Sequence, residues 1–142
     1  EPKTKVTAPT AMTKENTLYL PIKQIYFDQI IAGTKKIEYR EIKETTAKRY
    51  LKTDNSGSLI TNPDCTKPGN EYYIDDYNNG KFPFLPKDIK YLNLAVGYDA
   101  VRDTAVVEVT NITFLPQNIQ DRLYAFWFAE FHLGKVISLK RK

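Results

Sequence analysis

Four residues in the first third of the chain have types and a spacing that could form a ligand site. Gly33, Lys35, Glu38 and Arg40 follow one another as G-x-K-x-x-E-x-R. Residues two apart on a β-strand share one face at about 6.5 to 7 Å, so that Glu38 and Arg40 can pair or bracket one ligand group. The pattern predicts either a ligand-facing cluster or an ordinary ion pair on a solvated strand with a nearby turn lysine.

The elements that position this cluster are predicted from periodicity. Residues 18 to 20 form an apolar run typical of a short buried strand, and Pro21 is expected to close it because proline cannot donate to a sheet ladder. From Ile22 onward apolar residues recur every four positions, which predicts a helix of about three turns. Gly33 is expected to end the helix in the left-handed conformation. Residues 36 to 40 then alternate with period two, which predicts a strand.

With this arrangement the sequence resembles the ASCH domain, the activating-signal-cointegrator homology family, and in particular its small single-domain bacterial or phage members. Gly33, Lys35, Glu38 and Arg40 match the family motif, and an apolar helix precedes them. The segments YLNLAVGY, AVVEVTNITF and FHLGKVISL resemble the family more loosely, so the likeness covers most of residues 18 to 139. The resemblance implies an α+β fold with a PUA-like, mostly antiparallel β-barrel of about five to six strands and two or three short helices.

The resemblance also implies that a polar cleft binds RNA or a modified nucleoside. Glu38 can accept a hydrogen bond from an exocyclic amine, whereas Lys35 and Arg40 can bind carbonyl or phosphate oxygens. Tyr72 and Tyr73 are further ligand-binding candidates, because tyrosine rings can stack on a base. RNA or a nucleoside is therefore the expected partner, and no cofactor is expected.

One branch of the family implies an alternative activity, the amidohydrolases that remove the acetyl group from acetylcytidine. Their nucleophile is a threonine at the position of Glu38, with a lysine matching Lys35 and another glutamate elsewhere. This chain lacks that threonine, so a covalent route through a hydroxyl is in doubt. Lys35, Glu38 and Glu108 remain candidate catalytic residues that could activate a water molecule. Glu108 either lines the mouth of a barrel or faces solvent.

The chain is expected to form a single domain over residues 17 to 142, after a flexible tail over residues 1 to 16. Residues 53 to 86 read as a long insertion rich in asparagine, glycine, proline and aspartate. Its tyrosines between residues 72 and 77 could stack on a base, anchor a surface insertion or contact a protein partner. A protein-interaction module is therefore a third candidate function. The acidic residues beside these tyrosines favour a surface insertion, since they would repel phosphates.

The later part of the chain is expected to contain two hairpins. The first joins residues 89 to 98 with residues 104 to 114, and Glu108 lies on its second strand. The second is expected over residues 126 to 139 and turns at Gly134. A short helix is also predicted from Pro116.

Basic residues gather after the motif strand. Lys43, Lys48, Arg49 and Lys52 surround a short helix expected to begin at Thr45. They form either a phosphate-contacting flank beside the motif or a solvated helix face, which is the more common arrangement. A phosphate role would make binding depend on salt.

Composition limits the remaining function classes. The formal net charge of +4 permits a polyanionic partner without requiring one. Cys65 is the only cysteine and His132 the only histidine, so neither an internal disulfide nor a zinc site is predicted. His132 is expected to be a hydrogen-bonded structural residue. No apolar run reaches the length of a membrane span, and we expect a soluble cytoplasmic protein without a membrane partner.

Overall fold

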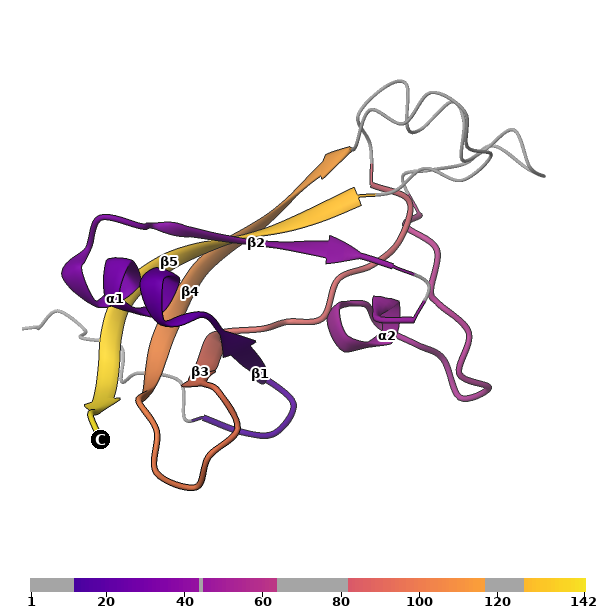
Figure 1. Cartoon of the computed structure of the whole chain (residues 1–142). Helices are drawn as coiled ribbons and strands as arrows, with labels where there is room; N and C mark the ends of the chain where they lie inside the picture. The colour runs from indigo at the N-terminus through magenta and orange to yellow at the C-terminus, as the bar shows by residue number, and fades with distance from the viewer. Residues whose placement is uncertain (1–11, 44, 64–81, 117–126) are drawn as a thin grey trace, which may run out of the picture.

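The computed structural model describes residues 12–43, 45–63, 82–116 and 127–142. Within these residues five strands form one curled sheet in the order β1-β3-β4-β5-β2, accompanied by two short helices (Figure 1). The elements are β1 (Thr17–Ile22), α1 (Gln24–Ala32), β2 (Ile37–Ile42), α2 (Ala47–Tyr50), β3 (Tyr91–Val96), β4 (Thr104–Pro116) and β5 (Trp127–Lys140). β1 and β3 are parallel, and the other neighbouring pairs are antiparallel. The predicted α+β class is confirmed as a curled, mostly antiparallel half-barrel.

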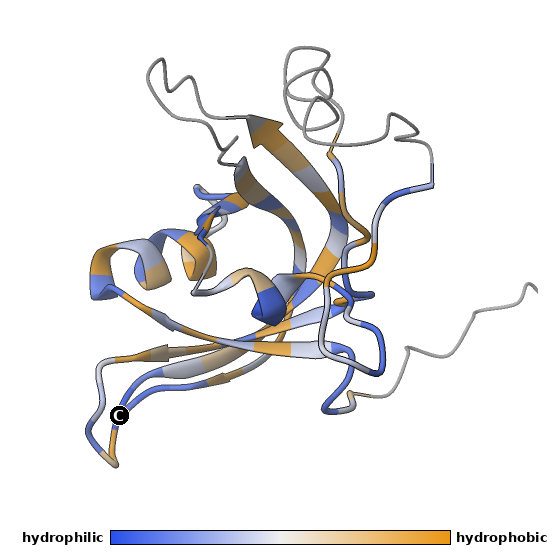
Figure 2. Ribbon diagram, turned by 90° about the vertical axis from the view of Figure 1, so that its right-hand side faces the viewer, coloured by the Kyte–Doolittle hydropathy of each residue, from blue (hydrophilic) through white to orange (hydrophobic). Residues whose placement is uncertain are grey.

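The core fills the concave side of the curled sheet. α1 contributes Phe27 and Ile30 to it, and α2 contributes Tyr50, whose ring lies 6.0 Å from that of Phe131 on β5. Phe27 and Phe131 are fully buried. In Figure 2 the sheet bends around the space that contains the helices. Burial of this apolar surface therefore fixes the helices against the sheet.

The first two elements follow the sequence pattern with one exception. β1 continues through Pro21 to Ile22, so the prediction that Pro21 closes the strand is wrong. β1 is an edge strand, and a proline whose missing N–H faces the unpaired side removes no ladder hydrogen bond. The prediction for Gly33 is confirmed, because it ends α1 in the left-handed conformation with φ 82°.

The predicted first hairpin is confirmed as β3 and β4, whereas the predicted second hairpin is wrong. β5 is one continuous strand through Gly134. Gly134 does not have a positive φ. Its missing side chain serves close packing instead, since a Cβ there would lie 2.5 Å from Glu108 Oε1 and 2.9 Å from Thr110 Cγ2. The pairing of β4 with β5 also contains register shifts in this region, which are typical of bulges that strengthen the curl.

Several other predictions concern the loops. The prediction that the short helix begins at Thr45 is wrong, because α2 begins at Ala47 and Thr46 is its N-cap residue. The Thr46 hydroxyl accepts from the Lys43 backbone N–H instead of capping the helix. At the end of the predicted insertion, Phe82 and Phe84 pack against the core, and the Phe82 ring stacks on Phe114 at 3.9 Å. The predicted helix after Pro116 and most of the predicted tail lie outside the described residues.

Neither described helix has the length and apolar character that a membrane crossing requires.

Candidate functional site

The three charged residues of the motif meet at one buried carboxylate. Glu38 Oε1 lies 3.5 Å from Lys35 Nζ, and Glu38 Oε2 accepts a hydrogen bond of 2.8 Å from Arg40 Nε. The Glu38 side chain is 7% exposed, compared with 19% for Lys35 and 23% for Arg40. Because a buried charge is costly unless it is paired, the two cations offset the cost of burying the Glu38 carboxylate at this position.

The fold around α1 sets the position of Lys35. The Gln29 carbonyl at the end of α1 accepts from the backbone N–H groups of both Thr34 and Lys35, at 3.0 and 3.1 Å. The Lys35 ammonium then lies 5.2 Å from the centre of the Tyr26 ring and 5.5 Å from that of Tyr39. These cation–π contacts keep the ammonium near Glu38.

Register on β2 sets the position of Glu38 and Arg40. Glu38 lies opposite Phe131 of β5 and Arg40 opposite Ala129, and both of these partners are fully buried. The predicted period of two is therefore confirmed, and the polar side chains take the concave face. Tyr39, between them, points the other way and is 47% exposed. Because Glu38 is buried, the alternative that Glu38 and Arg40 form an ordinary ion pair on a solvated strand face is wrong.

Arg40 also connects β2 to β1. Its Nη2 donates to the Pro21 carbonyl at 2.9 Å, while its Nε donates to Glu38. Among the described residues its Nη1 has no hydrogen-bond partner, and Arg40 lines an open cleft. Arg40 can therefore brace the fold and still present a donor to a ligand.

The cleft has a volume of ≈ 640 Å³ and combines this charged floor with tyrosine rings. Tyr26 comes from α1, Tyr39 from β2 and Tyr98 from the turn after β3. Their exposed fractions are 42%, 47% and 84%, so the rings are accessible. A carboxylate, a guanidinium and accessible rings in one cleft suit a flat polar ligand.

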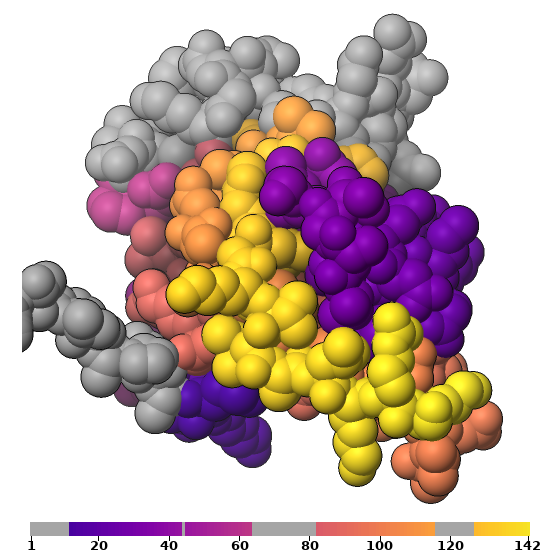
Figure 3. All heavy atoms as spheres, turned by 90° about the vertical axis from the view of Figure 1, so that its left-hand side faces the viewer, coloured from indigo at the N-terminus to yellow at the C-terminus, as the bar shows by residue number. Residues whose placement is uncertain are grey.

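A second set of charges holds one wall of the cleft. Gln24, which lines the cleft at the start of α1, donates to Asp103 Oδ2 at 2.9 Å. Arg141 Nη1 donates to the same oxygen at 2.9 Å and to Asp28 at 3.0 Å, and the Lys142 N–H donates to Asp103 Oδ1. Figure 3 shows the yellow end of β5 lying against the purple segment that contains α1. Donation from the Lys142 N–H, followed by Gln24 and Arg141, lowers the pKa of Asp103 to about 2.

Glu108, the remaining candidate catalytic residue, is not part of this cleft. Its Oε1 accepts from the Lys135 N–H at 3.4 Å, beside Gly134 and Thr110. The structure therefore does not bring Glu108 together with Lys35 and Glu38. Tyr72 and Tyr73 lie outside the described residues.

His132 lies on β5, where its Nε2 is 2.7 Å from the Thr113 hydroxyl. Its predicted hydrogen-bonded role is therefore confirmed. The described part of the chain contains no group of three or more histidine, cysteine or acidic side chains that could hold a metal ion.

The tyrosines of the cleft were missed by sequence reasoning. Tyr26 lies within the apolar periodicity that predicts the helix, Tyr39 lies within the alternating segment that predicts the strand, and Tyr98 is 58 residues beyond Arg40. The one signal that could have found the first two is that one tyrosine occurs on the helix before the motif and another between Glu38 and Arg40.

Comparisons of this chain with protein-family models, with curated proteins and with solved structures found no match. The resemblance to the ASCH family therefore stays a hypothesis, which depends on the motif and on its place between a helix and a strand.

Proposed function

We propose that the cleft binds an unpaired base of RNA or of a free nucleoside, and that the half-barrel is a PUA-like domain of the ASCH type. The observation that carries the proposal is the buried Glu38 carboxylate, held between two cations at the floor of a cleft with accessible tyrosine rings.

The hydrogen-bonding capacity of the floor defines the ligand. Each Glu38 oxygen has one cationic partner and can accept a further hydrogen bond, for example from an exocyclic amine. Arg40 Nη1 can donate to a carbonyl or ring nitrogen next to that amine. The floor therefore matches a base that carries a donor and an acceptor on one edge, and a ligand with the reverse order would leave buried groups unpaired.

The rim favours a base that is not paired with another strand. Stacking of a base on an aromatic side chain contributes about 1 to 3 kcal/mol and requires an accessible base face. Tyr98 is the most exposed ring of the cleft and the best placed to close over such a base. Single-stranded RNA and free nucleosides present this face, whereas a duplex hides it.

The amidohydrolase alternative has less support in the cleft. Lys35 and Glu38 lie together, but both Glu38 oxygens already contact cations, and the second glutamate, Glu108, lies elsewhere. The protein-interaction alternative depends on Tyr72 to Tyr77, which the described residues do not include. Both are therefore tested as outcomes of the binding experiment.

The test is a titration of the protein with single-stranded RNA and with free and acylated nucleosides, combined with chromatography of the products. Glu38→Gln is expected to weaken binding about tenfold or more, because a hydrogen bond to a charged group contributes about 1.5 to 3 kcal/mol. Lys35→Ala and Tyr98→Ala are expected to weaken it as well. Glu41→Gln is the matched control, because Glu41 lies on the same strand and pairs with Lys43 outside the cleft.

Circular dichroism of each variant checks that it is folded. Equal affinity of the Glu38→Gln variant and the parent protein would overturn the proposal. Product formation that both Lys35→Ala and Glu38→Gln abolish would make the hydrolase the primary function.

A further inference from the structure

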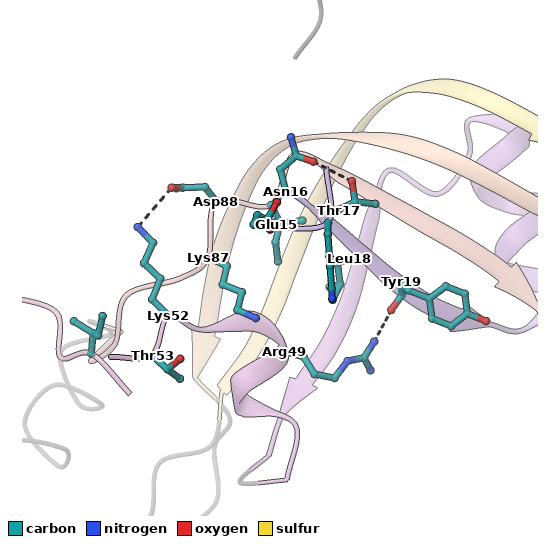
Figure 4. Close-up of a pocket in the computed structure, with 13 residues that line it drawn as sticks. Glu15, Asn16, Thr17, Leu18, Tyr19, Arg49, Lys52, Thr53, Lys87 and Asp88 are labelled. Carbon is teal, nitrogen blue, oxygen red and sulfur yellow. Dashed lines mark hydrogen bonds and ion pairs between the residues drawn. The ribbon is translucent and has the colours of Figure 1, made fainter. Parts of the chain in front are cut away.

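A second and larger groove lies next to the cleft. It has a volume of ≈ 890 Å³ and is lined by the start of β1, by α2 and by residues 87 to 89 (Figure 4). Four basic side chains line it, against two carboxylates. The basic residues are Lys14, Arg49, Lys52 and Lys87, and the acidic ones are Glu15 and Asp88. The groove therefore has an excess of positive charge, of which only part could be inferred from the basic run in the sequence.

The basic side chains of the groove are largely unneutralised. Lys52 pairs with Asp88 at 3.5 Å, but these side chains are 42% and 81% exposed, so the pair is weak and easily exchanged. Within the described residues neither Lys87 nor Arg49 has a carboxylate within 4.0 Å. Figure 4 shows Lys87 reaching into the space between Lys52 and Arg49. Cations therefore outnumber carboxylates in this groove, and two of them, Arg49 and Lys87, have no ion-pair partner among the described residues.

The groove and the cleft adjoin along the unpaired edge of β1. Thr17 to Tyr19 line the groove, whereas Pro21 and Ile22 line the cleft. Arg49 donates to the Tyr19 carbonyl, and Arg40 donates to the Pro21 carbonyl. These carbonyls are two residues apart on one strand, a separation of about 6.5 to 7 Å. The two guanidinium groups therefore stand side by side, one in each depression.

We propose that this groove binds the phosphates of the chain to which the base in the cleft belongs. The proposal depends on the function proposed for the cleft and narrows its ligand to a base within a single-stranded polynucleotide, in preference to a free nucleoside. A repeating anion suits a groove in which cations outnumber carboxylates, and guanidinium groups match phosphate oxygens in geometry. The exposed Tyr19 ring beside Arg49 offers a stacking surface for a neighbouring base.

The test compares a free nucleoside with a short single-stranded oligoribonucleotide of the same base, at several salt concentrations. The oligoribonucleotide is expected to bind more tightly, and its log affinity is expected to fall with log salt by about 0.7 per neutralised phosphate. In the double variant Lys52→Gln/Lys87→Gln this slope is expected to decrease by about 1.4. Binding of the nucleoside is expected to stay unchanged, because neither lysine lines the cleft.

Lys48→Gln is the matched control, since Lys48 lies on α2 next to Arg49 but does not line the groove. Arg49→Lys is a further variant that keeps the charge and removes the fork of the guanidinium. An unchanged salt slope in the double variant would overturn the groove proposal while nucleoside binding still upheld the cleft. Loss of oligoribonucleotide affinity in the double variant, together with no effect of Glu38→Gln, would uphold the groove and overturn the cleft. Polyglutamate that binds as tightly as the oligoribonucleotide would overturn the choice of a polynucleotide.

Discussion

Glu38 shows why a buried charge in this protein needs two partners. Its carboxylate is 7% exposed, and each oxygen contacts one cation. Removing one partner of a buried ion pair is more damaging than removing both, because the remaining charge stays buried without compensation. Arg40 is the more important partner, since it also reaches the Pro21 carbonyl on β1.

Arg40→Met is therefore expected to lower the free energy of unfolding by about 2 to 3 kcal/mol. This loss is smaller than the loss of about 3 to 5 kcal/mol typical of a fully buried ion pair, because Arg40 is 23% exposed. Urea denaturation followed by tryptophan fluorescence measures the change. Lys43→Met is the control, because Lys43 and Glu41 are 58% and 37% exposed, and its loss is expected to change stability by less than about 0.5 kcal/mol. Equal losses of unfolding free energy in the two variants would show that the burial of Glu38 does not determine how much its ion pair with Arg40 stabilises the fold.

At the scale of elements, one carboxylate holds the end of β5 to α1 and to the turn before β4. Asp103 accepts from the Lys142 N–H, from Gln24 and from Arg141, and these hydrogen bonds lower its pKa from 3.8 to about 2. A lowered pKa in the folded state means that the ionised form stabilises the fold. This contribution is complete above the unfolded pKa of 3.8 and is lost as the pH falls towards 2.

The Asp103→Asn variant is therefore expected to lose less stability than the parent protein between pH 4 and pH 2. Thermal unfolding at a series of pH values measures this difference. Part of the acid sensitivity is expected to remain in the variant, because hydrogen bonds from Arg141 and Gln24 also lower the pKa of Asp28. Parallel pH profiles for the variant and the parent would contradict this assignment.

Local patterns were sufficient to predict the elements whose ends depend on local chemistry. Gly33 ends α1 as expected, and alternating apolar residues identified the β3–β4 hairpin. Gly134 was misread because a glycine in an apolar run indicates either a turn or a close approach of another chain segment. Only the packing of Glu108 and Thr110 against Gly134 shows that this glycine permits a close approach and is not a turn. The parallel pairing of β1 with β3 joins residues more than 70 positions apart, which no local pattern reports.

The candidate site was predictable to a similar extent. The spacing of Glu38 and Arg40 indicated a shared strand face, but not that this face is the concave one. An apolar pattern would place Tyr39 inside, and instead it is 47% exposed. The position of Tyr98 in the cleft depends on the pairing of β1 with β3, and the groove at Arg49 depends on where α2 packs. Both are consequences of long-range contacts.

At the scale of the whole molecule, the half-barrel has two outer strands, each with one edge that pairs with no other strand among the described residues. β1 and β2 are the outer strands of the sheet, and no backbone ladder joins them within the described residues. Arg40 and Arg49 instead donate to the Pro21 and Tyr19 carbonyls on the open edge of β1. Unpaired edges invite association with other strands, so the two guanidinium groups also protect this edge.

Because side chains and not a ladder hold this edge, β1 is expected to open at a lower free energy than the interior pair of β4 and β5. In hydrogen exchange, the β1 amides are therefore expected to exchange faster than those of β5 around Phe131. Arg40→Met combined with Arg49→Met is expected to accelerate β1 exchange about tenfold or more, since each loses a hydrogen bond to a charged group. Lys43→Met combined with Lys48→Met is the control for the lost charge. Equal acceleration of exchange in β1 and in the centre of β5 would mean that β1 opens only when the whole protein unfolds, which contradicts the prediction. Acceleration in β1 alone would show that the two arginines stabilise this edge against local opening.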